Sequence, residues 1–210
     1  MIRRALVAAL AAAAVLAGQA RADGDPASDV LVVDRTFIPF EVTLPASLKD
    51  GLSQATLEAK QQGYPIRVAL ITTPSDLGAV PSLFGKPQTY AQFLWEELSF
   101  VYHGRVLVVM PNGFGIYAGK VPVEKEKRLL AAMKPGVGAN AMAASALNAV
   151  VKLAAASGYN LSVKPVAVEN AKPSSSSTNE DRFIIGGAVL AGLLVTAAAV
   201  YLGRRVRRPA

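Results

Sequence analysis

The sequence of 210 residues contains no cysteine and a single histidine, His103. Without cysteine the chain can have no disulfide framework, no thiol nucleophile and no zinc or iron–sulfur site held by thiolates. A single histidine excludes a metal centre built from several imidazoles. These two shortages remove whole classes of enzyme and of structural metal site from consideration.

The net charge of +7 is confined to the two ends of the chain. Three arginines precede residue 23 and four follow residue 203, whereas the segment between them carries 15 basic and 15 acidic residues and is neutral. Positive charge that flanks apolar runs is typical of membrane topology, not of a surface that binds phosphate backbones. The sequence therefore predicts no nucleic-acid partner.

Residues 1–22 have the pattern of a signal peptide. Arg3 and Arg4 precede the uncharged residues 5–17, which as a helix would span only ~20 Å of the ~30 Å hydrocarbon core. Ala20 and Ala22 satisfy the small-residue rule for cleavage before Asp23. An uncleaved anchor is the alternative, and the short apolar run and the cleavage pattern count against it.

Residues 183–202 carry no charge and are long enough to cross a bilayer as one helix. The alternative is a buried core helix, but the run is apolar on every face. Four arginines in the tail 203–210 predict that this tail is cytoplasmic. The expected product is a single-pass protein of the cell membrane, with the lipid bilayer as a partner and residues 23–170 on the outer side.

Residues 171–182 are polar and rich in serine, which is typical of a flexible linker. As a random coil, about ten residues have an end-to-end distance of roughly 17 Å. The linker would therefore hold the preceding domain close to the membrane.

Residues 23–170 are predicted to form one α/β domain. In the expected helix 45–62, Leu48, Leu52, Ala55 and Ala59 share one face and Gly63 follows as a C-terminal cap. The other expected elements are a short strand or extended lead-in at 29–34, strands at 66–72, 105–110, 115–118 and 161–168, and helices at 87–101, 123–133 and 142–157.

The strands at 66–72 and 105–110 are nearly all apolar and lack alternation. Such strands are normally covered on both faces, so the pattern predicts a three-layer α/β/α sandwich. The two strands would be parallel neighbours connected through the helix at 87–101.

Several segments, in this order, resemble the TPM-domain family, which includes thylakoid-lumen phosphatase-like and photosystem II repair proteins. The resemblance covers roughly residues 45–160. It rests on the strand 66–72 followed by Thr73-Pro74, the helix beginning Tyr90-Ala91, the lead His103-Gly104 before the second strand, and Ile116-Tyr117-Ala118-Gly119. The resemblance implies a Rossmann-like fold and, for some members, phosphatase activity or Ca²⁺ binding through acidic loops.

Asp76 and Asn112 are the candidate metal ligands, because each follows one of the two main strands and α/β sheets usually bind ligands at that end. The ion would be Ca²⁺ or Mg²⁺. Such a hard cation prefers several oxygen ligands, usually with two or more carboxylates, and these loops supply one. The alternative is that Asp76 is a turn residue after Pro74-Ser75.

No catalytic set or nucleotide site is assigned. His103 has no acidic or nucleophilic partner in the sequence. Gly113, Gly115 and Gly119 have the wrong spacing for a dinucleotide loop and indicate a turn between short strands, so no nucleotide cofactor is expected.

The expected function is a binding or scaffolding module at the cell envelope, with an envelope protein as partner. The alternative is a divalent-metal-dependent phosphatase on the outer side of the membrane.

Overall fold

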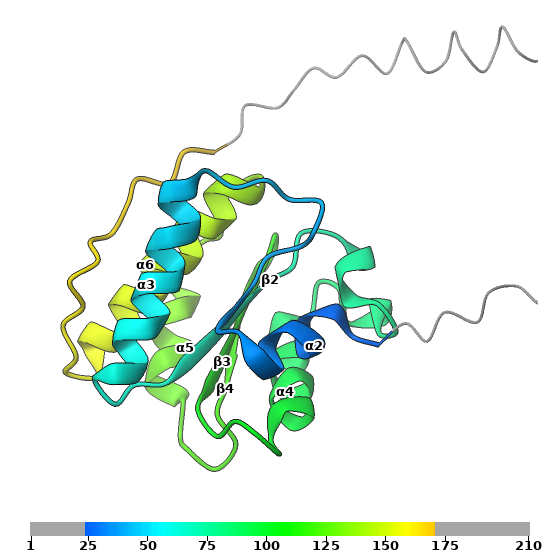
Figure 1. Cartoon of the computed structure of the whole chain (residues 1–210), viewed down its shortest axis with the longest axis horizontal. Coiled ribbons are helices and arrows are strands. Elements are labelled where there is room, and N and C mark those ends of the chain that lie inside the picture. Colours follow the sequence, from blue (N-terminus) through cyan, green and yellow to red (C-terminus); the bar gives the residue numbers. More distant parts are fainter. Residues whose placement is uncertain (1–23, 171–210) are drawn as a thin grey trace, which may run out of the picture. The chain divides into compact units, whose positions relative to one another are not determined.

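The computed structural model describes residues 24–170 (Figure 1). The predicted signal peptide 1–22, linker 171–182, membrane helix 183–202 and tail 203–210 lie outside the described residues. The fold is α/β, with a mixed four-stranded sheet and helices on both of its sides. Its elements are α2 (Pro26–Val33), β1 (Thr36–Phe37), α3 (Ala46–Gln61), β2 (Ile66–Leu70), η1 (Pro74–Leu77), η2 (Pro81–Leu83), α4 (Pro87–Leu98), β3 (Arg105–Met110), β4 (Gly113–Tyr117), α5 (Glu124–Ala131) and α6 (Ala139–Ala156).

The sheet has the order β1-β2-β3-β4. β1, β2 and β3 are parallel, with Ile66 opposite Arg105 and Leu70 opposite Val109. β4 runs antiparallel to β3 after a tight turn. The predicted parallel pair connected through a helix and the predicted short return strand are both confirmed.

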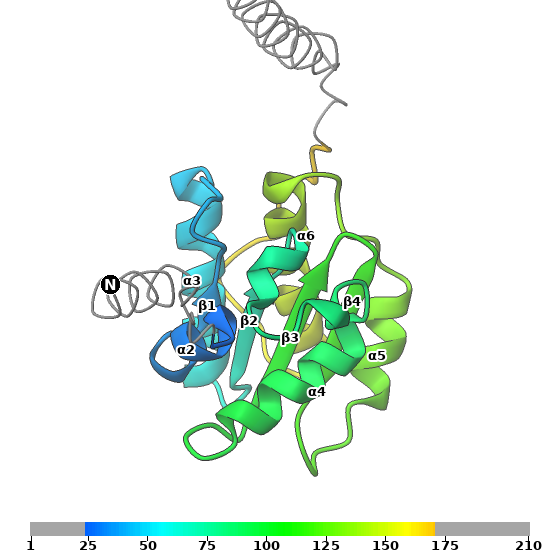
Figure 2. The same cartoon turned by 90° about the vertical axis from the view of Figure 1, so that its right-hand side faces the viewer.

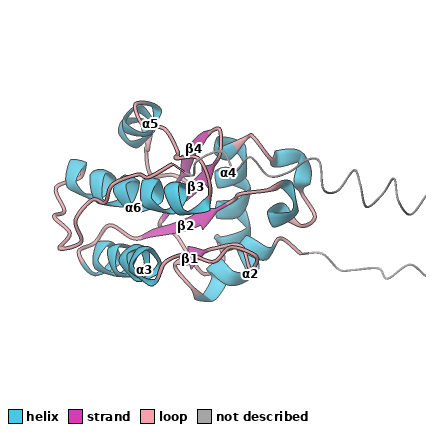
Figure 3. Ribbon diagram, turned by 90° about the horizontal axis from the view of Figure 1, so that it is seen from above, coloured by secondary structure: helices cyan, strands magenta, loops and turns pink. Residues whose placement is uncertain are grey.

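Two buried clusters lie against opposite faces of the sheet (Figure 2). Ile66, Val68 and Leu70 of β2 pack with α3 and α6, whereas Ala69 packs with α2 and α4. Because both faces are covered, the strand sequence is apolar at nearly every position. Figure 3 shows α3, α5 and α6 on one side of the strands and α2 and α4 on the other.

The crossover helices α3 and α4 lie on opposite faces, although the three strands that they connect are consecutive and parallel. The two crossovers therefore have opposite hands, which departs from the right-handed rule. β1 is only two residues long, so few sheet hydrogen bonds depend on this connection.

The four predicted helices are confirmed with small changes at their ends. In α3, Leu52, Ala55 and Ala59 are buried, and Gly63 follows the helix with a φ of 95°. A positive φ at this position favours glycine and stops the helix. The predicted helix 87–101 ends earlier, at Leu98, so Val101 is left exposed.

Residues 29–34 form neither a strand nor an extended segment, so this prediction is wrong. Residues 29–33 belong to helix α2, and Asp34 is its C-terminal cap. The N-terminal cap of α2 is Asp25, whose carboxylate accepts from the Ala27 amide at 3.3 Å. Pro26 occupies the first position of the helix, where a missing N–H costs nothing. The valine-rich sequence favoured a strand and outweighed this start signal. The strand in this region is the short β1, which follows α2.

The predicted strand at 161–168 is also wrong. We call residues 158–170 the strap, an irregular segment beside α3 and α6, drawn in gold in Figure 1. The Asn148 side chain donates to the Val166 carbonyl and accepts from its amide, both at 2.8 Å. The Ser162 amide donates to Glu58 at 2.7 Å. Side chains of two helices therefore provide the hydrogen bonds that a sheet edge was expected to provide.

Among the described residues, α6 is the one helix whose length and composition would allow it to cross a membrane. Of its 18 residues, 61% lie buried inside the fold. A core helix meets the same criterion, so α6 carries no membrane assignment.

Candidate functional site

The carboxyl ends of β2 and β3 place Asp76 and Asn112 at the same edge of the sheet. Asp76 lies in η1, directly after β2, and Asn112 lies in the turn between β3 and β4. Since β2 and β3 are adjacent and parallel, this common edge agrees with the position expected from the sequence.

The carboxylate of Asp76 organises its own loop. Its Oδ2 accepts from the Thr72 amide at 2.7 Å, the Thr72 hydroxyl at 2.9 Å and the Thr73 amide at 2.9 Å. Its Oδ1 accepts from the Thr73 hydroxyl at 3.0 Å. A carboxylate offers about four lone-pair positions. Oδ2 accepts three of the four hydrogen bonds, so a cation bound to it would have to displace a donor, whereas Oδ1 accepts one and keeps one lone-pair position.

Asn112 ties the β3–β4 turn to the loop before α4. Its Nδ2 donates to the Gly85 carbonyl at 2.6 Å. Asn112 also lines a cavity of about 330 Å³ with Gln88, Phe114 and Lys127, and Asp76 does not line this cavity. The structure therefore brings the two residues to one edge but not into one cavity.

Within residues 24–170, no group of three or more histidine, aspartate or glutamate side chains is arranged to hold a metal ion. Asp76 and Asn112 therefore stay a prediction as ligands for Ca²⁺ or Mg²⁺. A ligand set there would need oxygens from backbone carbonyls or water as well.

The first turn of α4 closes the outer edge of β4. Gln88 donates to the Ile116 carbonyl at 2.9 Å and accepts from its amide at 3.2 Å, so the side-chain amide occupies both backbone groups. A Cβ at Gly115 would lie 2.0 Å from the Pro87 carbonyl oxygen. The glycines around residue 115 thus belong to a turn and a strand, as expected, and the close approach of α4 accounts for one of them.

Asp25 is a buried acid that the sequence analysis did not single out. Its side chain caps α2, and the Tyr90 hydroxyl of α4 donates to its Oδ1 at 2.7 Å. Its Oδ2 is buried and has no partner among the described residues. Burial, opposed by the Tyr90 hydrogen bond, raises the pKa of Asp25 from 3.8 to about 6. An Asp-Pro pair before an apolar run was the available signal of a helix start.

Burial also raises the pKa of the Tyr90 hydroxyl, with the Asp25 charge adding to the effect. The pair is therefore a neutral hydroxyl that donates to a carboxyl whose protonation changes near pH 6. It connects α2 to α4 on the face of the sheet opposite α3 and α6.

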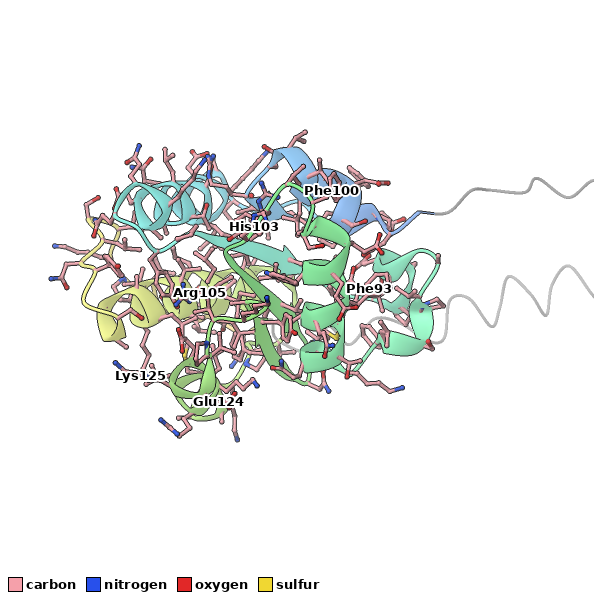
Figure 4. The ribbon with its side chains drawn as sticks, turned by 90° about the horizontal axis from the view of Figure 1, so that it is seen from below. Phe93, Phe100, His103, Arg105, Glu124 and Lys125 are labelled. Atoms are coloured by element: carbon pink, nitrogen blue, oxygen red, sulfur yellow. The ribbon has the colours of Figure 1, made fainter. Side chains whose placement is uncertain are left out.

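His103 lies at the other edge of the sheet. It is exposed on the connection that leads from α4 into β3, as is Phe100 three residues earlier (Figure 4). Because it precedes β3 and Asp76 follows β2, the two residues are at opposite ends of parallel strands. The structure does not combine His103 with the two predicted metal ligands.

No family model, no curated protein and no solved structure matches this chain. Its placement in a family and its function are therefore proposals that rest on its own residues.

Proposed function

We propose that residues 23–170 form a TPM-like, three-layer α/β/α domain that serves as a binding or scaffolding module on the outer side of the cell membrane. The mixed sheet, with a buried cluster on each face, supports the fold. The order of β2, Thr73-Pro74, the Tyr90 helix and the two strands β3 and β4 supports the family.

The two uncharged runs and their flanking arginines support the location. Residues 1–22 would direct export, residues 183–202 would hold the chain in the lipid bilayer, and the tail 203–210 would remain in the cytoplasm. The linker 171–182 would keep the domain near the membrane surface, where an envelope protein is the expected partner.

The hydrogen bonding of Asp76 is the observation that favours a binding module over an enzyme. This carboxylate stands where α/β folds usually hold their ligand, and it accepts four hydrogen bonds from Thr72 and Thr73. A carboxylate that accepts hydrogen bonds from its own loop stabilises the conformation of that loop, here residues 72–76. A metal-dependent hydrolase needs at least one such oxygen for its ion.

A divalent-metal-dependent phosphatase is the second candidate function. The placement of Asp76 and Asn112 after neighbouring parallel strands favours it. Ca²⁺ or Mg²⁺ bound there would use the remaining position of Asp76 Oδ1 or displace a donor from Oδ2, and would polarise a phosphoryl oxygen.

Titration of the full chain in non-ionic detergent with Ca²⁺ and Mg²⁺, together with hydrolysis of p-nitrophenyl phosphate, distinguishes the two functions. We expect no saturable cation binding and no turnover. We expect Asp76→Asn to lower the free energy of unfolding by about 1 kcal/mol, because a cap is weakened. Asp50→Asn removes the same charge from an exposed site on α3 and is the control. Metal-dependent turnover that disappears in Asp76→Asn and persists in Asp50→Asn would establish the phosphatase.

A further inference from the structure

A cavity of about 350 Å³ opens at the amino ends of the parallel strands, at the edge opposite Asp76. Four of its lining residues carry basic side chains: Arg35, Lys60, Arg67 and His103. None of the described residues that line it is acidic. They come from the start of β1, the last turn of α3, β2 and the lead into β3, so the fold gathers them from four separate segments.

The alternation of the strands puts Arg67 on the face of α2 and α4, where none of the described acidic side chains forms an ion pair with it. Arg105 of β3 points to the face of α5, where Glu126 accepts from its Nε at 3.1 Å. Arg67 lies between Ile66 and Val68, which pack on that same α3 and α6 face, so its side chain leaves the sheet on the other face. There its guanidinium lies over the Tyr102 ring, 4.1 Å from the ring centroid.

Two guanidinium nitrogens near this cavity are buried without a hydrogen-bond partner among the described residues, Nε of Arg35 and one Nη of Arg67. Buried charges are normally paired. Burial and the neighbouring charge of Arg35 lower the pKa of Arg67. Two arginines kept close together, with no carboxylate between them, create a positive potential that an anion would relieve.

The ring of Tyr102 limits the motion of Arg67, and the Tyr102 hydroxyl is itself fixed by donating to the Arg105 carbonyl at 2.9 Å. Gly104 leaves room for this arrangement, since a Cβ there would lie 2.3 Å from the Tyr102 hydroxyl oxygen. The guanidinium is therefore held in place before any ligand arrives, which lowers the entropic cost of binding.

Apolar side chains border the same cavity. Val33 is 79% exposed and Val101 is 48% exposed, and both line it. Phe100 follows the end of α4 and is exposed as well (Figure 4). Basic side chains next to exposed apolar side chains suit an anion that also has an apolar portion.

We propose that this cavity binds a phosphate group, held by Arg35 and Arg67 with Lys60 and His103 at its mouth. Several cations around one small cavity fit a tetrahedral oxyanion, and the guanidinium fork matches phosphate oxygens. The phosphate has two sources, a free phosphate anion and the headgroup of an anionic phospholipid. The lipid source rests on the proposed position of the domain beside the membrane. Phosphate recognition itself does not.

The test is isothermal titration of the full chain in non-ionic detergent. One arm uses inorganic phosphate, and the other compares short-chain phosphatidylglycerol with short-chain phosphatidylcholine. We expect saturable binding of phosphate, of phosphatidylglycerol, or of both. We expect Arg67→Gln to weaken it by about tenfold or more, since a charged hydrogen bond is lost. Arg128→Gln, at an exposed site on α5, is the matched control and should leave binding unchanged.

The outcomes separate the two sources. Binding of inorganic phosphate alone identifies a free anion, binding of phosphatidylglycerol alone identifies a lipid headgroup, and binding of both identifies a site that accepts the phosphate group from either source. Absence of binding in both arms, equal binding of phosphatidylcholine, or equal weakening by Arg67→Gln and Arg128→Gln would each overturn the proposal. If Arg67→Gln does not fold, Lys60→Gln and His103→Gln decide instead, because both side chains are exposed.

Discussion

Arg67 of β2 and Arg105 of β3 lie one residue apart in the register of the two strands, so their side chains leave the sheet on opposite faces. Arg105 has Glu126 as its ion-pair partner and lies over the Tyr64 ring, with its guanidinium 4.1 Å from the ring centroid. Arg67 lies over Tyr102 at the same distance but has no carboxylate. The first arginine contributes to the stability of the fold, and we attribute the second to ligand binding.

The two arginines should therefore respond differently to replacement by methionine. Arg105→Met leaves Glu126 buried without its partner and should lower the free energy of unfolding by about 3 kcal/mol. Arg67→Met removes a charge that has no partner and should lower it by no more than about 1 kcal/mol, the value of the lost ring contact. Urea unfolding of both variants measures the difference. Equal losses would contradict the assignment of Arg67 to ligand binding.

Asp25 makes the stability of the domain depend on pH in the unusual direction for an acid. Its pKa is raised to about 6 in the folded chain, so the folded chain holds this proton more tightly than the unfolded chain. The resulting contribution to stability is complete below about pH 4 and is lost as the pH rises through 6. For a shift of this size it is on the order of 2–3 kcal/mol.

Asp25→Asn should remove this dependence. Because the amide is neutral at every pH, the variant should be more stable than the parent at pH 7, and its stability should change less between pH 4 and pH 7 than that of the parent. Thermal unfolding at a series of pH values measures both effects. Asp50→Asn changes an exposed acid on α3 that does not act on Asp25, and it should leave the parent's profile intact. A variant of Asp25 that is less stable at pH 7 would contradict the assignment.

At the scale of residues, the sequence predicted where a side chain lies in the fold better than it predicted its hydrogen-bond and ion-pair partners. The strand order was enough to bring Asp76 and Asn112 to one edge. The four hydrogen bonds of Asp76 depend on the local path of residues 72–76, which no periodicity reveals. Arg67 was visible as a charge inside an apolar strand, but its lack of a counter-charge follows only from the helices that pack around it.

The strap, residues 158–170, is attached by side chains of α3 and α6. Asn148 alone makes two hydrogen bonds to Val166, and the Ser162 hydrogen bonds lower the pKa of Glu58. Leu161 and Val163 pack partly against the buried cluster. The strap therefore combines little apolar burial with a few polar attachments.

Asn148→Ala should release the middle of the strap without unfolding the domain. Loss of two hydrogen bonds should lower the free energy of unfolding by about 1–2 kcal/mol. Hydrogen exchange should show faster exchange of the Val166 amide, whereas β3 amides remain protected. Asn140→Ala, at the exposed start of α6, is the control. Unchanged exchange at Val166 would show that apolar contacts hold the strap.

At the scale of elements, the long periodic segments and the short return strand β4 were predicted correctly, whereas two valine-rich segments were not. The helices and the two central strands follow from their apolar pattern, since each buries a defined face. Residues 29–34 and 161–168 are both rich in valine, and their conformation is decided by capping in one case and by neighbouring side chains in the other. β1 is too short to have a pattern of its own.

For the whole molecule, the arrangement across the membrane remains a prediction that a protease can test. A tag fused after Ala210 should survive protease added to intact spheroplasts, whereas a tag inserted after Asn179 should be digested, because the arginines of the tail keep it in the cytoplasm. Replacement of the four tail arginines by glutamate should weaken this orientation. Digestion of the tag after Ala210, or release of the chain by carbonate, would contradict the topology.

The strap also determines the mechanical response of the domain. A pull on the chain beyond Asn170 first meets the bond that the Val137 amide donates to the Asn170 side chain at 2.8 Å, then the attachments at Val166 and Ser162. Because these attachments lie one after another along the strap, each bears load only after the one before it has broken. The strap should therefore detach and extend before the strands of the sheet bear load.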